Sequence, residues 1–124
     1  RSPLAAAGLL DLLLFFCGRR LLLQIQGDSM LPTLEPGDRV LVKRVSKKPS
    51  HLPAIGSVVV AWHPVKPNIR LIKRLSDAHE SGLWLTGDNP EASTDSRQLG
   101  LIPRTNLIGV VVSVVSSRRS EHRR

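Results

Sequence analysis

The 124-residue chain contains no tyrosine, one cysteine, one methionine, two phenylalanines and two tryptophans. Proteins that bind single-stranded nucleic acid stack the bases on aromatic side chains, so this shortage argues against a nucleic-acid partner. Cys17 has no partner for an internal disulfide and lies within an apolar run, which is typical of a buried structural thiol. The four histidines lack the spacing of metal ligands, so we expect no metal and no cofactor.

The length allows one domain with one modest core. The formal net charge of +8 is unevenly distributed, because four arginines and one glutamate occupy the last seven residues. We therefore expect residues 117–124 to form a solvated, disordered basic tail.

Residues 3–17 form an apolar run that is interrupted by Asp11. A spanning helix needs roughly 20 apolar residues, and a central Asp costs about 2.5–3.5 kcal/mol. The segment 1–20 therefore predicts a short apolar helix, and a marginal membrane anchor, a membrane-surface helix, a packing helix and a cleaved signal peptide all stay open. If the run spans a membrane, Arg19 and Arg20 outweigh Arg1 and place the remaining chain in the cytoplasm. We thus expect a membrane-associated or cytoplasmic protein.

Beyond this segment, short β-type runs alternate with turns rich in glycine and proline. The predicted strands cover residues 21–26, 39–45, 57–62, 69–75, 83–86 and 107–116. Residues 87–103 form the longest stretch without a strand signal, and long loops in compact domains often carry function. We therefore expect a mainly β protein in which residues 21–116 form one small, strongly bent, barrel-like sheet domain.

Ser29 is a candidate nucleophile on a constrained turn. The preceding strand ends at Gly27, and Pro32 biases Leu31 away from helix. Gly27 allows a substrate backbone to approach closely, and the amide of Ser29 is placed to face an oxyanion. Taken alone, however, a serine on a polar turn is more often merely solvated, and that alternative stays open here.

Lys73 is a candidate general base, because burial lowers the pKa of a lysine toward the range in which it accepts a proton. In the strand predicted over 69–75, Lys73 shares the apolar face with Leu71 and Leu75, while Arg74 faces outward. A lysine that protects a sheet edge is the plain alternative. The rival base is His63 in a Ser-His-Asp triad, but no motif ties this histidine to the serine.

Three ordered motifs give these residues a context. They are Ser29-Met30-Leu31-Pro32-Thr33 followed by Gly37-Asp38, then Ile72-Lys73-Arg74, then Gly87-Asp88-Asn89 followed by Ser93-Thr94-Asp95-Ser96-Arg97. Together they resemble the signal peptidase I family (peptidase S26), whose fold is a bent β-sheet domain. The resemblance implies a serine-type endopeptidase that removes leaders from precursor proteins without a cofactor.

The resemblance also assigns roles to individual residues. It implies that Ser29 is the nucleophile and Lys73 the general base, and that Ser93 orients the lysine amine. Asp95 and Arg97 are expected to form an ion pair that holds the loop. Beside the nucleophile, Met30 and Leu31 are expected to line an apolar pocket for small side chains such as alanine. Some family members carry a second serine two residues before the nucleophile, where this chain has Gly27, so the second oxyanion donor is undetermined.

Residues 56–74 are similar to the small branch of the family, and particularly to nickel-type superoxide dismutase maturation proteases. The precursor of nickel superoxide dismutase is therefore the expected substrate. A general signal peptidase I and a mitochondrial inner membrane protease remain alternatives. A self-cleaving repressor-type domain would need an upstream helix-turn-helix, which is not visible. A non-catalytic peptide-binding module is the other rival, and the intact serine and lysine argue against it.

Overall fold

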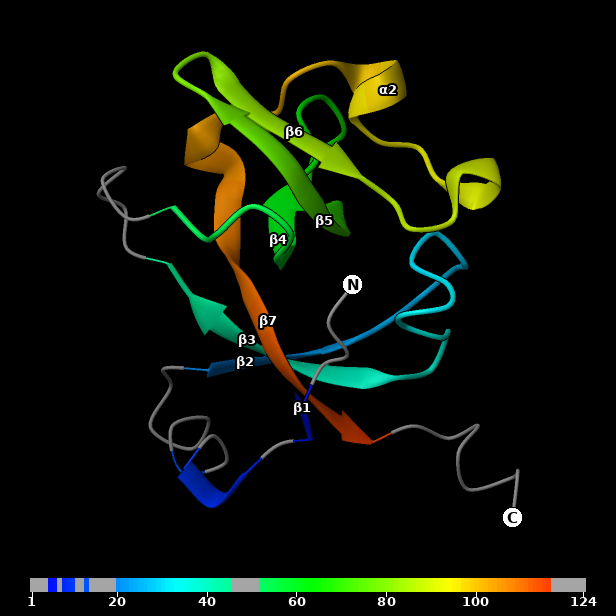
Figure 1. Ribbon diagram of the computed structural model, residues 1–124, viewed down its shortest axis with the longest axis vertical. Coiled ribbons are helices and arrows are strands. Elements are labelled where there is room, and N and C mark those ends of the chain that lie inside the picture. The colour runs from blue at the N-terminus through cyan, green and yellow to red at the C-terminus, as the bar shows by residue number, and fades with distance from the viewer. Residues whose placement is uncertain (1–4, 7, 11–12, 14–19, 46–51, 117–124) are drawn as a thin grey trace.

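The structure, a computed structural model, describes residues 5–6, 8–10, 13, 20–45 and 52–116. It is mainly β, with one antiparallel sheet in the order β2-β3-β7-β4-β5-β6 (Figure 1). The strands are β2 (Arg20–Gln24), β3 (Arg39–Arg44), β4 (Val58–Trp62), β5 (Arg70–His79), β6 (Gly82–Thr86) and β7 (Leu107–Ser116). The two-residue strand β1 (Ala5–Ala6) pairs in parallel with β7.

The six predicted strands are confirmed, although β5 ends at His79 rather than at Leu75. The barrel-like description needs correction. Within the described residues the sheet is open, because β2 and β6 lie at its two ends and are not paired with each other. The strand β7 runs through both halves of the molecule, with β2 and β3 on one side and β4, β5 and β6 on the other (Figure 1).

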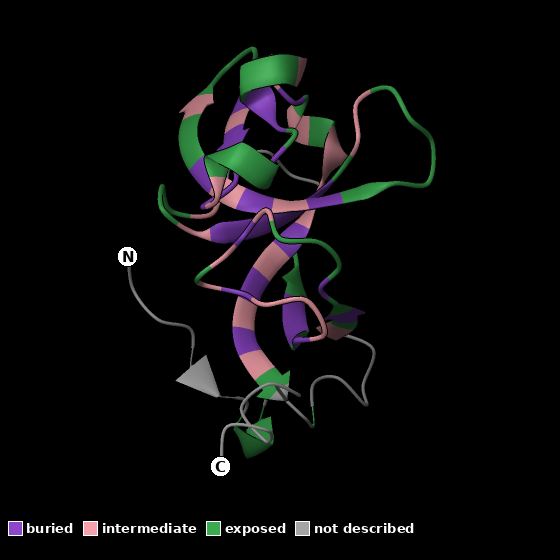
Figure 2. Ribbon diagram, turned by 90° about the vertical axis from the view of Figure 1, so that its right-hand side faces the viewer, coloured by how far each residue is buried: buried purple, intermediate pink, exposed green. Residues whose placement is uncertain are grey.

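The core consists of two clusters that follow these two halves. Val40, Val42 and Val60 lie in the first cluster, which also receives Met30 and Leu34 from the turn after β2. The second cluster joins β4, β5 and β6 to the segment after α2 and consists of Val59, Ala61, Leu71, Leu75, Leu83, Leu85 and Ile102. Burial is thus concentrated along the strands, while most turns are exposed (Figure 2).

Residues 87–106 connect β6 to β7 and contain three short helical turns. These are the 3-10 turn η1 (Pro90–Ala92), the single-turn helix α2 (Ser96–Leu99) and the 3-10 turn η2 (Arg104–Asn106). Leu83 and Ile102 exchange backbone hydrogen bonds of 2.7 and 2.8 Å, so the connection folds back along β6. The predicted loop is therefore an ordered structure that packs against the sheet.

Several predictions about the chain ends fall outside the described residues. They concern Cys17, most of the apolar segment 1–20 and the basic tail 117–124. Among the residues that the structure does describe, no helix is long and apolar enough to cross a membrane.

Candidate active site

Ser29 lies on the turn that follows β2. Gly27 has a φ of 78°, a left-handed conformation that turns the chain away from the strand direction. The buried side chains of Met30 and Leu34 fix the other end of the turn in the core. The carbonyl of Ser29 accepts a 2.8 Å hydrogen bond from the amide of Asn89. The turn is thereby held from both sides, and the half-buried Ser29 has a defined position.

Lys73 lies in the middle of β5, where the predicted alternation is confirmed. Leu71, Lys73 and Leu75 are buried, and only 6% of Lys73 is exposed to solvent. Burial lowers the pKa of the Lys73 amine below its ordinary value of 10.5. The carboxylate of Asp95 opposes this shift, and the guanidinium of Arg97 adds to it. The neutral amine is therefore easier to reach for Lys73 than for an exposed lysine.

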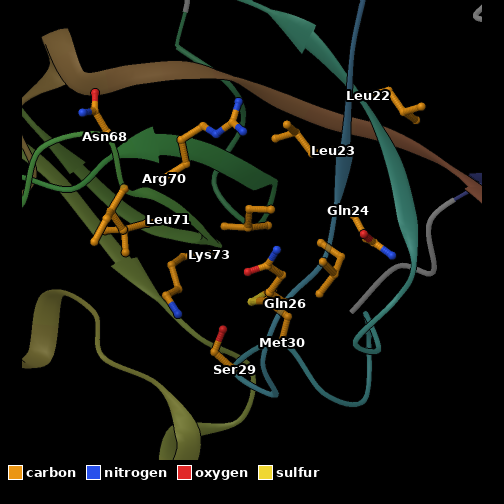
Figure 3. A pocket seen from close by; sticks show the side chains of 13 residues that line it. Leu22, Leu23, Gln24, Gln26, Ser29, Met30, Asn68, Arg70, Leu71 and Lys73 are labelled. Carbon is orange, nitrogen blue, oxygen red and sulfur yellow. The ribbon is translucent and has the colours of Figure 1, made fainter.

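The side chains of Ser29 and Lys73 point toward one another at one end of a groove (Figure 3). Neither the serine hydroxyl nor the lysine amine makes a hydrogen bond to any other described residue. The amide of Ser29 likewise donates no hydrogen bond within the described part of the chain. The Ser29 hydroxyl, the Lys73 amine and the Ser29 amide thus lie together at one end of the groove, and none of them has a protein hydrogen-bond partner among the described residues.

The groove, of about 540 Å³, lies between two unpaired strand edges. On one side is β2, which pairs only with β3. On the other side is the first part of β5, because β6 pairs with β5 only from Arg74 onward. The residues that line the groove are Leu22, Leu23, Gln24, Ile25, Gln26, Ser29, Met30, Asn68, Ile69, Arg70, Leu71, Ile72 and Lys73. Two free edges that face each other form a slot suited to an extended peptide.

The two predicted pocket residues lie differently. Met30 is only 1% exposed and lines the groove. Leu31, by contrast, does not belong to the groove lining. Because Met30 also belongs to the first core cluster, it joins the floor of the groove to the interior.

A second hollow, of about 310 Å³, reaches the same serine and lysine. Its lining consists of Gln26, Gly27, Asp28, Ser29, His63, Lys66, Ile69, Leu71, Lys73, Ala92 and Thr94. Five of these residues also line the groove, so the two hollows meet at Ser29 and Lys73. A chain lying in the groove therefore has space to continue past the serine.

His63 lines the second hollow but is poorly suited to be the base. Its Nδ1 accepts hydrogen bonds from the amides of Val65 and Lys66, at 3.1 and 2.9 Å. A ring nitrogen that accepts two hydrogen bonds carries no proton, so the proton of the neutral ring is on Nε2. That nitrogen donates and cannot take a proton from Ser29. The geometry thus argues against the Ser-His-Asp alternative.

Asp95 is the centre of the loop after β6. Its side chain is fully buried and accepts 2.7 Å and 2.5 Å hydrogen bonds from the Gly87 amide and the Ser93 hydroxyl. Arg97 donates to both carboxylate oxygens, from Nε at 3.0 Å and from Nη2 at 2.6 Å. Asp95 also caps α2 by accepting from the Arg97 amide, while the Asp95 amide donates to Gln98. One carboxylate thus holds the loop, the helix cap and Ser93 together.

These contacts also set the charge state of Asp95. Burial by itself raises the pKa of this carboxyl. The hydrogen bonds from Arg97, Gly87 and Ser93 outweigh that effect and hold the pKa well below its ordinary value of 3.8. The observed partner of the Ser93 hydroxyl is therefore this ionised carboxylate, and the suggested contact between Ser93 and the Lys73 amine stays a prediction.

Gly87 brings the loop and the serine turn into close approach. A Cβ at this position would lie 2.3 Å from the Ser93 hydroxyl and 2.7 Å from the Ser29 carbonyl oxygen. Both distances are shorter than non-bonded atoms accept, and one of the two neighbours is backbone. Only a glycine lets Ser93 and the backbone of Ser29 lie on either side of this residue.

Sequence reasoning missed a second ion pair beside the lysine. Arg74, predicted to face outward, is in fact mostly buried, with 12% of its side chain exposed. It binds both carboxylate oxygens of Asp88, from Nε at 3.1 Å and from Nη2 at 2.5 Å. Thr33 donates a 2.6 Å hydrogen bond to the same carboxylate, and Arg74 also reaches the Gly56 carbonyl. Strand alternation assigned the correct face, but it could not reveal that the loop after β6 covers that face.

The Arg74, Asp88 and Thr33 contacts join all three sequence motifs. Thr33 lies four residues after the serine, Arg74 directly follows the lysine, and Asp88 is the second residue of the loop motif. All three residues stand inside the motifs, but nothing in the sequence alone indicates that they contact one another. Their mutual contact required the fold.

Comparisons with known proteins agree with this arrangement. The family model for signal peptidase, peptidase S26, matches residues 4–76 and 77–116. The chain therefore belongs to the peptidase S26 signal peptidase family. It is 52% identical to a probable signal peptidase I-1 of Synechocystis sp., over 68% of this chain and 65% of the relative.

Two mitochondrial relatives are more distant. A mitochondrial ATP-independent inner membrane protease subunit 1a of Arabidopsis thaliana is 32% identical, over 68% of this chain and 64% of the relative. A mitochondrial inner membrane protease subunit 1 of Mus musculus is 33% identical, over 62% of this chain and 58% of the relative. The chain thus matches about three fifths of the length of these curated relatives.

Proposed function

We propose that this chain is a serine endopeptidase that removes an N-terminal leader from a precursor protein, with Ser29 as nucleophile and Lys73 as general base. The observation that carries the proposal is a buried lysine of lowered pKa whose amine points at a half-buried serine at the end of a groove. Membership of the peptidase S26 family supports the same reaction class.

The proposed reaction uses the two side chains in two stages. The neutral Lys73 amine takes the proton of the Ser29 hydroxyl as Oγ attacks the carbonyl carbon of the scissile peptide bond. The free amide of Ser29 donates a hydrogen bond to the oxyanion that forms. The C–N bond then breaks, the protonated lysine gives its proton to the leaving amine, and an ester on Ser29 remains.

In the second stage Lys73 accepts a proton from water, and the resulting hydroxide attacks the ester carbonyl. The Ser29 oxygen leaves and recovers its proton from the lysine. Asp95, Ser93 and Arg97 do not take part in these transfers. We propose that Asp95 and Arg97 fix the loop, and that Ser93 is thereby held near the lysine amine, which it orients.

An extended leader fits between the free edges of β2 and β5. Backbone groups of the leader pair with either edge, and alternate side chains then point toward the Ser29 end of the groove floor. The buried Met30 closes that floor, and we propose that it limits the leader side chain there to a small one. Alanine immediately before the cleaved bond, which is usual for secretory leaders, meets this requirement.

The first expected result is a pH dependence. For a leader peptide without titrating side chains, kcat/KM should fall tenfold per pH unit on the acid side of the Lys73 pKa, because a protonated amine cannot accept the serine proton. Burial places this inflection below the ordinary value of 10.5. Initial rates measured from pH 5 to pH 11 give the profile. An inflection at the ordinary lysine value, or none, would contradict the assignment of the base.

We further propose the precursor of nickel superoxide dismutase as the substrate, on the resemblance of residues 56–74 to the maturation proteases of that enzyme. A general signal peptidase is the second candidate, and the names of the relatives favour it. Those names also favour a membrane location, and attachment through residues 3–17 is part of this proposal. The sidedness stays open.

The two substrates can be compared directly. Equal amounts of the superoxide dismutase precursor and of an exported precursor with an Ala-x-Ala site are incubated with the protein, and the products are identified by mass spectrometry. We expect the dismutase precursor to be cleaved at least about tenfold faster, a difference of about 1.4 kcal/mol in transition-state binding. The opposite ratio would assign the chain to general leader processing.

A further inference from the structure

The groove carries positive charge and no negative charge. Among its thirteen lining residues the ionisable side chains are Arg70 and Lys73, and there is no aspartate or glutamate. Lys73 acts as a base only in its neutral form. At the pH of catalysis Arg70 is therefore the charge that a bound leader meets, since an arginine stays protonated in proteins.

Arg70 lies at the far end of the groove from Ser29 (Figure 3). Its guanidinium forms no hydrogen bond or ion pair with another described residue. Arg74, on the same face of β5, by contrast forms an ion pair with Asp88. The polar amide side chains that line the same groove, those of Gln24, Gln26 and Asn68, are neutral. Arg70 is thus a cation held at a substrate groove without a protein counter-ion among the described residues.

For a leader that runs parallel to β5, the strand spacing determines which leader residue reaches Arg70. Arg70 precedes Lys73 by three residues, which is about 10 Å along an extended strand. A leader that pairs in parallel with this edge and places its last residue beside Lys73 brings its fourth residue before the cut level with Arg70. The alternation of side chains agrees, because the first and third residues share the Lys73 face and the fourth shares the Arg70 face.

We propose that Arg70 is a specificity-determining residue that selects an acidic side chain at the fourth position before the cleaved bond. This inference rests on the proposed function and names the substrate class of the same site. An aspartate or glutamate at that position pairs with the guanidinium across the mouth of the groove, and a lysine there is disfavoured by like charge.

The test compares two synthetic leader peptides that differ only by Asp or Asn at the fourth position before the cut. We expect kcat/KM to be about three- to fivefold higher for the Asp peptide at low salt, and the ratio to approach one in 1 M salt. The variant Arg70→Gln should lose the Asp/Asn preference, and Arg70→Glu should prefer Lys to Asn at that position. The matched control Arg44→Gln removes an exposed arginine that does not line the groove, and it should keep the wild-type ratio.

A second pair of peptides carries Asp or Asn at the fourth position after the cut. Their ratio should not depend on Arg70. A preference that responds to Arg70 only on this side, or a ratio unchanged by Arg70→Gln, overturns the inference.

The binding of the same peptides separates this inference from the proposed function. The variant Ser29→Ala is used, and the Kd of each peptide is measured by fluorescence anisotropy. A three- to fivefold preference for Asp that disappears in the double variant with Arg70→Gln supports the groove assignment even if the wild-type protein cleaves nothing. Cleavage without any Arg70-dependent preference leaves the proposed function standing and contradicts the role of Arg70.

Discussion

Replacing Ser29 with alanine, or Lys73 with methionine, should reduce kcat/KM for leader cleavage by about 10⁴- to 10⁶-fold. Methionine is chosen because it keeps the apolar stem of the lysine in the space between Leu71 and Leu75. In the proposed reaction the two residues act as one unit, since the hydroxyl is a weak nucleophile without the amine. The double variant should therefore be no less active than the worse of the single variants.

The controls for this experiment are chosen by burial. Lys43→Met makes the same chemical change at an exposed position of β3 and should cleave at close to the wild-type rate. Thermal unfolding of each variant shows whether the fold is intact. Burial disfavours the charged form of the Lys73 amine, so replacing this lysine with an apolar side chain removes a desolvation penalty. We therefore expect the Lys73→Met variant to be at least as stable as the wild type, and slightly more stable. Cleavage by Lys73→Met at the wild-type rate would end the Ser/Lys hypothesis.

Replacing Asp95 with asparagine should lower the free energy of unfolding by about 2–4 kcal/mol at neutral pH. The carboxylate is fully buried and accepts hydrogen bonds from Gly87, Ser93 and Arg97. An amide has one acceptor oxygen in place of two and turns its NH₂ group toward other donors. Activity should fall as well, because the loop that holds Ser93 loses its anchor. Chemical denaturation of the variant and the wild type measures the difference.

The pH dependence of this difference has a defined sign. The folded-state pKa of Asp95 lies below the unfolded value, so its stabilisation is present in full above about pH 4 and is lost as the pH falls through the folded-state pKa. The gap between wild type and Asp95→Asn should therefore shrink in acid. The control is Asp77→Asn, since the exposed Asp77 carboxylate contacts only the exposed His79 ring, at 3.1 Å, and the neighbouring Ala78 amide, so the change should stay within about 0.5 kcal/mol. Equal effects of the two substitutions would contradict the anchoring role of Asp95.

Apolar β-type runs between turns were sufficient to place the strands, although β3 and β4 bury consecutive residues. In the first part of β5, period-two alternation was sufficient to predict the burial of Lys73 between Leu71 and Leu75. It failed where β5 continues from Ser76 to His79, since these residues have no apolar alternation and are held by pairing with β6. It also could not predict that the sheet stays open, because closure depends on twist and register rather than on side-chain pattern.

The sequence predicted the five motif residues of the candidate site, but it did not predict the buried role of Arg74. Ser29, Lys73, Ser93, Asp95 and Arg97 were chosen from motif positions, and the structure places the first two at one groove and the last three in one loop. The role of Arg74 as a buried ion-pair partner was not predictable, because a face that alternation marks as outward can still be covered by a distant segment. Long-range contacts of this kind are absent from any local pattern.

The contacts among Thr33, Asp88 and Arg74 indicate where residues could be inserted into the chain without a change in the site. Because these contacts tie the three motifs directly to one another, the geometry of the site does not depend on the length of the segments between them. The β5–β6 turn at Glu80 and Ser81 is exposed and lies at the far end of the hairpin from Arg74 and Thr86. We therefore expect an insertion at this turn, even a long one, to leave the groove unchanged.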